Sequence, residues 1–283
     1  MPTKTKPRGL TARTADKHIL YERAVQSIPA DIKFMDRMCK QHMGRLPVLL
    51  REDFCGTAAL ATAFVGGRPG GRAYGVDLHG PTLAWGLKNH IARLPEEAQG
   101  RITLIEEDVL NAVTPPGDVV LGLNFSYSVF KTRERLRQYF AAAREALKPG
   151  GVFIIDAFGG TESAIDYSER RKLVASETLE GERVPPFTYV WEQARFDVIS
   201  HDITCKIHFE FRDGSEMRNA FTYDWRHWSL PELQELMREA GFGTVEVYLH
   251  GWHADTGTSD GAYRKWKRYE NAESWLAYVV GVR

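Results

Sequence analysis

The chain has 283 residues, of which 43% are hydrophobic and 26% are charged, as in ordinary soluble globular proteins. Lysine plus arginine and aspartate plus glutamate both number 37, so no net charge attracts nucleic acid or an anionic membrane. No apolar run is long enough to cross a bilayer, and three cysteines are too few for a disulfide framework. We therefore expect a cytoplasmic protein with no nucleic-acid or membrane partner. The oligomeric state is not indicated.

The first predicted elements are helices. Residues 16–43 have helical character that is interrupted near Pro29, because a proline inside a helix removes a backbone hydrogen bond. We group residues 1–44 as an N-terminal helical cover.

Short apolar strands then alternate with amphipathic helices over residues 45–160. The predicted strands cover 47–52, 71–78, 101–108, 117–126 and 152–158, and the predicted helices cover 57–65, 81–94 and 132–151. This alternation indicates a parallel sheet that is covered on both faces. Because such connections are right-handed, a doubly wound, Rossmann-like α/β fold is predicted.

Residues 161–226 have a different pattern. Apolar and polar residues alternate over 203–211, and an Asp-Gly pair at 213–214 predicts a hairpin turn. Residues 187–198 predict a third antiparallel strand. We therefore expect a small antiparallel β insertion that acts as a substrate lid.

Residues 227–283 return to the first pattern. They contain a predicted helix at 229–242 and two predicted strands at 244–251 and 274–282. The two strands are close enough in the chain to pair antiparallel, and they would complete the core sheet.

The loop after the first strand reads EDFCGTA and contains one glycine, Gly56. A dinucleotide loop needs several glycines, because a pyrophosphate must approach the backbone and the helix N-terminus. Phe54 stands where the first of these glycines would be. An adenosine cofactor without phosphates needs only one close backbone contact, which Gly56 can provide.

Acidic residues end three consecutive predicted strands: Glu52, Asp77 and Asp108. Asp77 follows Gly56 by 21 residues, the spacing at which a ribose-binding carboxylate is expected. Three acids disfavour a phosphate but suit a neutral adenosine that is joined to a sulfonium and an ammonium group. Solvated acids at strand ends are the alternative interpretation.

With Asp77 and the EDV segment at 107–109, the stretch LLREDFCGTAAL resembles the cofactor loop of class I S-adenosylmethionine-dependent methyltransferases. The resemblance covers residues 45–160, and the final strand pair also fits. Phe54 and Ala58 replace two glycines of the family motif. Two further stretches, NFSYSVFKTRERL and YDWRHWSLPELQELMREAGF, are similar to a bacterial, fungal and plant branch with a DFCGTA loop. That similarity implies no substrate.

The resemblance implies a seven-stranded sheet and S-adenosylmethionine as the cofactor. It implies that Asp77 binds the ribose, that Asp108 and the Val109 backbone bind the adenine, and that the residues after the fourth strand face the transferred methyl group. The complete set of expected cofactor contacts adds neighbours of these residues: Glu52, Phe54, Gly56, Thr57, Leu78, Asn124, Phe125 and Ser126.

Two further cofactor candidates have alternatives. Arg51 could pair with the cofactor's carboxylate, or it could bind Glu106 or solvent. Tyr21, in the first helix, could close over the cofactor or pack between helices. No metal is expected, although His250, His253 and Asp255 lie close together in the sequence.

The residues expected near the acceptor are aromatic or titratable. Trp191, Trp225 and Trp228 are candidate substrate residues, although some aromatic residues of the insertion must form its core. His227 and Tyr127 are the candidate catalytic bases, with packed structural residues as the alternative.

We expect a methyltransferase that acts on a small-molecule acceptor in a lid-covered pocket. The alternatives are a protein or peptide methyltransferase and a non-catalytic S-adenosylmethionine-binding partner protein.

Overall fold

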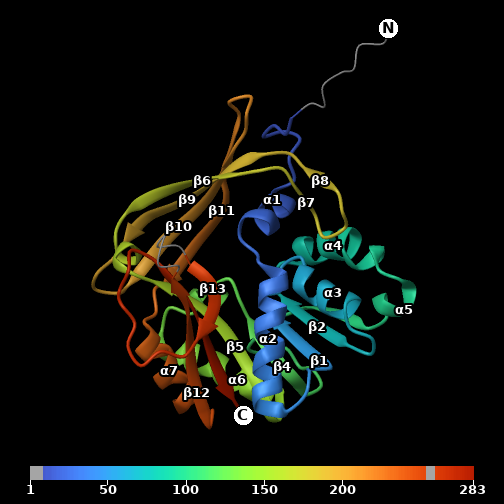
Figure 1. Cartoon of the computed structure of the whole chain (residues 1–283), viewed down its shortest axis with the longest axis vertical. Coiled ribbons are helices and arrows are strands. Elements are labelled where there is room, and N and C mark those ends of the chain that lie inside the picture. The colour runs from blue at the N-terminus through green and yellow to red at the C-terminus, as the bar shows by residue number, and fades with distance from the viewer. Residues whose placement is uncertain (1–8, 253–258) are drawn as a thin grey trace. The chain divides into compact units, whose positions relative to one another are not determined.

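We describe the protein from a computed structural model of residues 9–252 and 259–283. The chain forms two compact units, whose elements are labelled in Figure 1. Unit 1 contains the chain up to Gln26 together with Ile165–Trp225, and unit 2 contains Ser27–Ala164 and Arg226–Arg283. The predicted N-terminal cover, residues 1–44, is divided between the two units.

An eight-stranded sheet forms the centre of unit 2. Its strands are β1 (Leu49–Asp53), β2 (Arg72–Asp77), β3 (Ile102–Glu106), β4 (Gly117–Gly122), β5 (Leu147–Gly159), β12 (Thr244–Trp252), β13 (Ser259–Arg264) and β14 (Trp275–Val282). Their order is β13-β12-β14-β5-β4-β1-β2-β3. The five strands from β5 to β3 are parallel, whereas β14 is antiparallel to β5 and β12, and β13 is antiparallel to β12.

Helices cover both faces of this sheet. The helices are α2 (Ile28–Met43), α3 (Ala59–Gly66), α4 (Gly80–Asn89), α5 (Glu96–Gln99), α6 (Arg133–Glu145) and α7 (Leu230–Glu239), with short 3-10 turns η1 (Ile91–Arg93), η2 (Ser126–Val129) and η3 (Thr161–Ala164). Leu121 and Ile154 share a core with α2 and α3, whereas Val120 and Ile155 share a core with α6 and α7. Successive residues of one strand therefore bury opposite faces, as in a doubly wound sheet.

The predicted doubly wound α/β fold is confirmed, and the last two predicted strands pair antiparallel as expected. The sheet has eight strands where seven were expected, because β13 adds to the outer edge of β12. Its sequence, SDGAYR, has no apolar alternation, so no strand signal was available.

Unit 1 contains a four-stranded antiparallel sheet with the order β11-β10-β9-β6. Its elements are α1 (Lys17–Ala24), β6 (Tyr167–Leu173), β7 (Ser176–Glu177), β8 (Arg183–Val184), β9 (Phe187–Phe196), β10 (Asp202–Glu210) and β11 (Glu216–Arg226). In β10 every second residue is buried, as the alternation predicted. Leu20 of α1 packs in the same core as Ile207 and Phe209. The edge strand β6 was missed because YSERRKL is almost entirely polar, a composition that discourages pairing with other chains.

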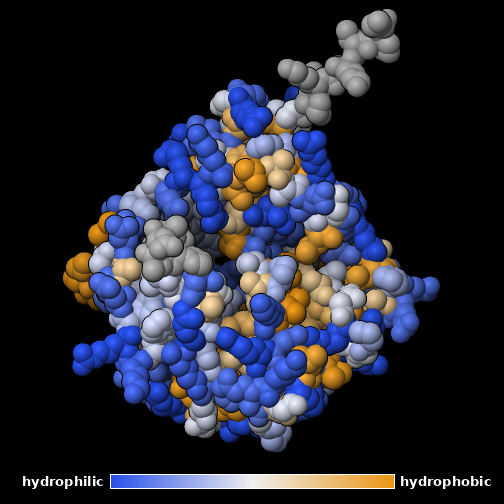
Figure 2. All heavy atoms as spheres, viewed as in Figure 1, coloured by the Kyte–Doolittle hydropathy of each residue, from blue (hydrophilic) through white to orange (hydrophobic). Residues whose placement is uncertain are grey.

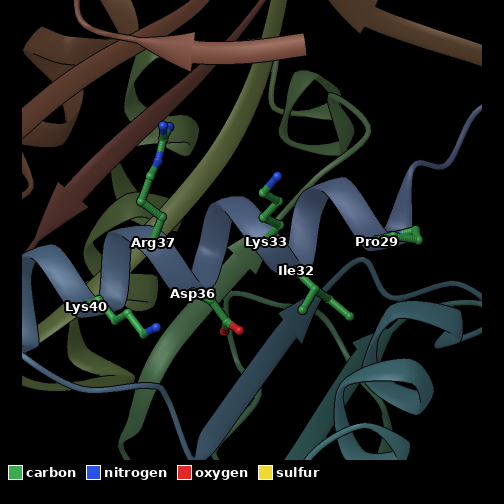
Figure 3. Close-up of a pocket in the computed structure, with 6 residues that line it drawn as sticks. All are labelled: Pro29, Ile32, Lys33, Asp36, Arg37 and Lys40. Carbon is green, nitrogen blue, oxygen red and sulfur yellow. The ribbon is translucent and has the colours of Figure 1, made fainter.

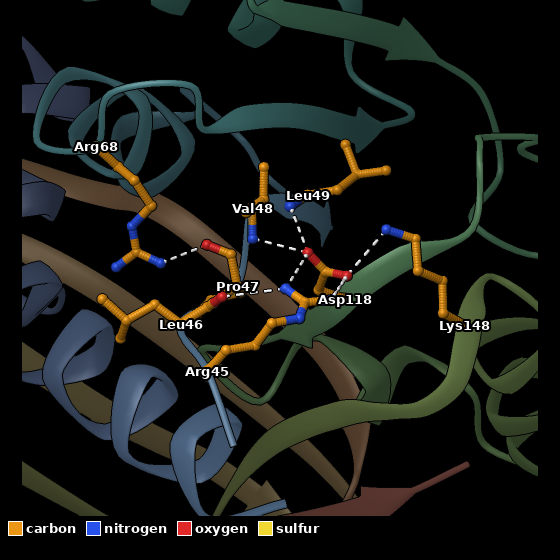
Figure 4. A network of polar contacts seen from close by, with 8 residues as sticks. All are labelled: Arg45, Leu46, Pro47, Val48, Leu49, Arg68, Asp118 and Lys148. Atoms are coloured by element: carbon orange, nitrogen blue, oxygen red, sulfur yellow. Dashed lines mark hydrogen bonds and ion pairs between the residues drawn. The ribbon is translucent and has the colours of Figure 1, made fainter. Parts of the chain in front are cut away.

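A buried carboxylate fixes the amino ends of β1 and β4 (Figure 4). Asp118 Oδ2 accepts hydrogen bonds from the backbone N–H groups of Val48 and Leu49 at 2.7 and 3.0 Å. Arg45 and Lys148 donate to Oδ1 at 2.8 and 2.9 Å. Burial opposes ionisation, but these hydrogen bonds, that of Arg45 above all, hold the pKa of Asp118 well below its usual range. These contacts stabilise the amino ends of the parallel strands, and the carboxyl ends lie at the opposite end of the same strands.

The face of the protein drawn in Figure 2 is largely polar. Figure 2 shows hydrophilic residues over most of the visible face, with hydrophobic residues in small separate groups. Among the helices of the described residues, none has the length and hydrophobicity needed to span a membrane.

Candidate functional site

The loop after β1 has an unusual backbone. Phe54, Gly56 and Ala58 all adopt the left-handed conformation, with φ of 55°, 54° and 54°. Glycine takes this conformation without strain, whereas a side chain makes it costly. Phe54 and Ala58 stand where the family motif has glycines. The loop therefore has a left-handed backbone at three alternate positions, although only one of the three residues is a glycine.

Asp77, at the end of β2, is bonded to this loop. Its Oδ2 accepts a hydrogen bond from the Gly56 N–H and its Oδ1 accepts one from the His79 N–H, both at 2.8 Å. The carboxylate thus connects the loops that follow β1 and β2. It is only half-buried, and each oxygen has a second lone pair that can accept a hydrogen bond from a ligand.

Glu52 is the penultimate residue of β1, one residue before the strand end where it was predicted, and it is almost completely buried, with 8% exposure. Its Oε2 accepts a hydrogen bond from the Ala61 N–H at 2.9 Å. Burial above all, together with the nearby carboxylates of Asp31, Asp77 and Asp53, raises the pKa of Glu52 to about 8, although the Ala61 hydrogen bond lowers it. A cation bound beside Glu52 would therefore favour its ionised form.

Arg51 is buried on the other face of β1 from Glu52, and its partners belong to the protein. Its Nε donates to Asp53 Oδ1 at 2.7 Å, while Nη1 and Nη2 donate to the carbonyl groups of Ala112 and Val109, both at 2.9 Å. The guanidinium thus fixes the loop after β3. These contacts account for its burial without the predicted cofactor carboxylate and without the alternative partner Glu106.

The remaining predicted adenosine contacts lie on loops at the same edge. The Asp108 carboxylate is half-buried and accepts a hydrogen bond from the Leu110 N–H at 3.0 Å, and Val109 and Thr57 are buried. Leu78, directly after Asp77, is 69% exposed. An exposed apolar side chain beside a carboxylate suits a nucleoside, which has an apolar base and a polar sugar.

The turn after β4 is held by a residue that the sequence did not indicate. Asn124 and Phe125 both have φ of 58°. Their N–H groups donate to Oδ2 and Oδ1 of Asp156 in β5, at 3.0 and 2.9 Å. Ser126 Oγ donates to the Leu123 carbonyl at 2.8 Å. The only available signal for Asp156 was an acid inside an otherwise apolar strand, IIDAF.

Further acidic groups face this turn. Tyr278 of β14 is the register partner of Asp156, and its hydroxyl donates to Asp31 in α2. Burial raises the pKa of Asp31 to about 6 and that of Asp156 to about 7. The charges of Asp31 and Glu52 also interact. This concentration of carboxylates favours a cationic ligand.

The two candidate bases differ in their surroundings. Tyr127 is 2% exposed, and burial, followed by the charge of Asp156, raises the pKa of Tyr127 well above its usual range. A phenolate at neutral pH is therefore disfavoured, which argues against Tyr127 as the base. His227 packs edge-on against Phe158 at 5.2 Å between ring centroids, and Phe158 packs against Phe125 at 4.8 Å. His227 is thus connected to the turn after β4 through one aromatic ring.

Trp228 is a core residue of unit 2. It is 3% exposed, its indole N–H donates to the Phe130 carbonyl at 3.2 Å, and the Arg226 guanidinium lies 3.8 Å from its ring centroid. A side chain held in this way has little surface left for the predicted contact with an acceptor.

Tyr21, a predicted cofactor contact, and Trp191 and Trp225, predicted substrate contacts, lie in unit 1. Tyr21 packs against Phe221 at 4.9 Å between ring centroids, which agrees with the packing alternative. Trp225 is 4% exposed and stacks on Tyr223 at 4.2 Å. Trp191 is half-buried beside both rings. Trp191 is therefore the tryptophan of this group with the most accessible surface.

A solvent-open hollow of about 540 Å³ lies along α2 (Figure 3). The residues that line it are Pro29, Ile32, Lys33, Asp36, Arg37 and Lys40. None of the predicted site residues is among them. The hollow follows a single helix surface and does not indicate the site.

No metal centre is indicated within residues 9–252 and 259–283, where no group of three potential ligands occurs. His250 is buried against Trp252. The other two candidate ligands, His253 and Asp255, lie outside the described residues.

No protein-family model and no curated protein matches the chain, but solved structures are similar to it. The amino pentose methyltransferase CalS10 from Micromonospora echinaspora, solved with S-adenosylmethionine bound, is 18% identical, with a TM-score of 0.65 and coverage of 94% of this chain and 95% of that chain. The sugar N-methyltransferase KedS8 from a Streptoalloteichus species is 15% identical, with a TM-score of 0.63 and coverage of 100% and 97%.

A third similar structure is an S-adenosylmethionine-dependent methyltransferase from Clostridium acetobutylicum. It is 18% identical, with a TM-score of 0.61 and coverage of 92% of this chain and 95% of that chain. At these identities the similarity shows the fold alone. At the level of the fold, it confirms the resemblance to class I S-adenosylmethionine-dependent methyltransferases. The chain has the fold of the class I S-adenosylmethionine-dependent methyltransferases.

Proposed function

We propose that the protein is an S-adenosylmethionine-dependent methyltransferase that acts on a small-molecule acceptor. The observation that carries this proposal is the loop after β1, which has a left-handed backbone at Phe54, Gly56 and Ala58 and is bonded to Asp77 through Gly56. That geometry lets a ligand approach the backbone beside a ribose-binding carboxylate.

The residues at the carboxyl ends of the strands fit this cofactor. A Cβ atom added to Gly56 would have only one protein atom within 4 Å, Thr82 Cγ2 at 3.9 Å, so the space over this glycine is open. Asp77 would accept the ribose hydroxyl hydrogen bonds, and Asp108 with Val109 would hold the adenine. The carboxylate of Glu52 would favour the cationic end.

S-adenosylmethionine, when bound, supplies an activated methyl group on a sulfonium, which is a good leaving group. The protein then has to align the acceptor and exclude water, and such positioning can supply about 7–11 kcal/mol. The turn formed by Asn124, Phe125 and Ser126 is our candidate for this alignment. His227 remains the candidate base for an acceptor that must lose a proton.

A small-molecule acceptor is supported by the named activities of the similar structures, which include an amino pentose methyltransferase and a sugar N-methyltransferase. Transfer to a protein or peptide is the second candidate, and a cofactor-binding protein without transfer is the third. The expectation that Trp191 and Trp225 recognise the acceptor stays a prediction.

Two measurements test this proposal. Calorimetry should detect S-adenosylmethionine and S-adenosylhomocysteine binding, with NAD⁺ as the control ligand that does not bind. The purified protein is then incubated with radioactive S-adenosylmethionine and a cell extract that is separated into small molecules and macromolecules. Label in the small molecules supports the proposal, and label in the protein fraction supports the second candidate. Binding without label supports the third candidate, and absence of binding refutes all three.

A further inference from the structure

The turn after β4 has a strained backbone. Asn124 and Phe125 are consecutive non-glycine residues with φ of 58°. Asparagine enters the left-handed region fairly readily, whereas a bulky residue such as phenylalanine rarely does. Such conformations persist only where the surrounding structure enforces them, and they occur most often at functional sites.

One side chain binds both backbone N–H groups of this turn. Oδ2 of Asp156 accepts from Asn124 at 3.0 Å and Oδ1 accepts from Phe125 at 2.9 Å. An ionised carboxylate has two acceptor oxygens and no donor, so it suits two neighbouring donors, whereas an amide or a protonated carboxyl presents a hydrogen to one of them. Phe158, two residues further along β5, packs against the Phe125 ring at 4.8 Å. Strand β5 thus contacts the turn twice: Asp156 binds the backbone of the turn, and Phe158 packs against the Phe125 side chain.

The Asp156 carboxyl group changes between its protonated and ionised forms near neutral pH. Burial and, to a smaller extent, the charge of Asp31 in α2 raise the pKa of Asp156 to about 7, although the hydrogen bonds from the Phe125 and Asn124 N–H groups lower it. The other titratable groups that interact with Asp156 are tyrosines, namely Tyr127 of η2, Tyr263 of β13 and Tyr278 of β14. Tyrosines stay neutral at this pH, so the charge near the turn varies with its carboxylates and with His227, which packs against Phe158.

We propose that Asp156 is a positioning residue of the methyl-transfer site: its ionised carboxylate holds Asn124 and Phe125 in the left-handed turn and so sets the position of the loop that faces the transferred methyl group. The catalytic part of this inference rests on the proposed function. The structural part, a turn that depends on the charge of one carboxylate, does not.

The structural part can be tested without an acceptor. In the wild type, the amide proton signals of Asn124 and Phe125 should shift together with pH, with a midpoint near 7. In Asp156→Asn both signals should lose this titration, and both amides should exchange with solvent at least tenfold faster. Asp118→Asn is a matched control, since Asp118 also accepts from two consecutive backbone N–H groups but should leave Asn124 and Phe125 unaffected. Unchanged amide signals in Asp156→Asn would overturn the proposal.

A rescue experiment isolates the backbone strain. Phe125→Ala and Phe125→Gly both remove the ring, but only glycine relieves a positive φ. When Asp156 is present, Phe125→Gly should therefore give a higher melting temperature than Phe125→Ala, and this advantage should shrink in the Asp156→Asn background, where the turn can relax out of the left-handed conformation. An equal advantage in both backgrounds would show that Asp156 does not enforce the conformation.

The catalytic part requires a comparison of binding with transfer. Asp156→Asn should change the dissociation constant of S-adenosylmethionine less than threefold but lower labelling of the extract at saturating cofactor at least tenfold. Loss of binding and of transfer by the same factor would make Asp156 a cofactor ligand and refute the positioning role. If the wild type does not bind S-adenosylmethionine, the proposed function fails, while the amide signals and the rescue experiment still decide on the turn.

Discussion

Replacement of Asp77 should weaken cofactor binding strongly. An ionised carboxylate that accepts two ribose hydroxyl hydrogen bonds contributes about 1.5–3 kcal/mol for each bond, or roughly 2–4 kcal/mol together because the two are not additive. At 1.4 kcal/mol for each tenfold change, Asp77→Ala should raise the dissociation constant of S-adenosylmethionine about 30-fold or more. The structure adds a second cause, since Asp77 also binds the Gly56 and His79 N–H groups.

The two causes are separable with a ligand that lacks one hydroxyl. Wild-type protein should bind S-adenosylhomocysteine more tightly than its 2′-deoxy or 3′-deoxy analogue, because each analogue leaves a hydrogen bond of Asp77 unmade. In Asp77→Ala that preference should disappear, whereas a change that acts through the loop would weaken all three ligands equally. Isothermal titration calorimetry at one pH and salt concentration measures both effects.

Asp108→Ala provides the matched control. Asp108 lies at the same edge of the sheet, but it is assigned to the adenine, so its loss should weaken the three ligands while preserving the preference for both hydroxyls. An unchanged dissociation constant in Asp77→Ala, or a preference for the hydroxyls that survives in that variant, would refute the assignment of Asp77 to the ribose.

Four further predictions concern Asp118, Glu52, His227 and Trp191. Asp118→Asn should lower the free energy of unfolding by about 2–3 kcal/mol, since it weakens charge-assisted hydrogen bonds. Because the pKa of Asp118 is depressed, this stabilisation is present above about pH 4 and is lost as pH falls through the folded-state pKa. Denaturant titrations at several pH values can measure this loss. Since the pKa of Glu52 is raised to about 8, binding of the cationic cofactor near pH 7 should release protons, and calorimetry in two buffers should show that Glu52→Gln abolishes this component. His227→Gln at saturating cofactor tests for a base, which requires a fall in kcat of at least about 10²-fold and loss of the acidic limb near pH 6–7. Trp191→Ala should raise the KM of the acceptor without changing the cofactor's dissociation constant, and equal effects on both would make Trp191 a core residue.

Much of the fold was predictable because its signals are local. Apolar strands that alternate with amphipathic helices require a covered parallel sheet, and the structure has one. The proximity of Gly56 and Asp77 was also predictable, since Asp77 follows Gly56 by 21 residues, across one crossover connection. Spacing within one such unit is set by the lengths of its elements, so a single sequence reveals it.

The carboxylate cluster was not predictable in this way. Asp156 of β5 lies about a hundred residues after Asp31 of α2 and Glu52 of β1, and only the folded sheet brings its charge close to that of Asp31. Nothing in the local pattern around Asp31 distinguishes it from a solvent-exposed helical acid. Likewise, the partners of Arg51 are carbonyl groups about sixty residues away, and backbone acceptors have no sequence signal.

The loop after β1 has residues other than glycine at two positions with positive φ. Glycine is favoured where φ is positive, but another residue can occupy such a position when its contacts offset the strain. The Phe54 ring is half-buried and packs against Tyr139 and Phe130, at 5.4 and 6.1 Å between ring centroids. The buried Ala58 adds a single methyl group. Only Gly56 keeps the open space over its backbone, which is where a cofactor would approach. Phe54, Gly56 and Ala58 therefore follow one left-handed backbone path, and glycine stands at the position where we expect a side chain to meet the cofactor as well.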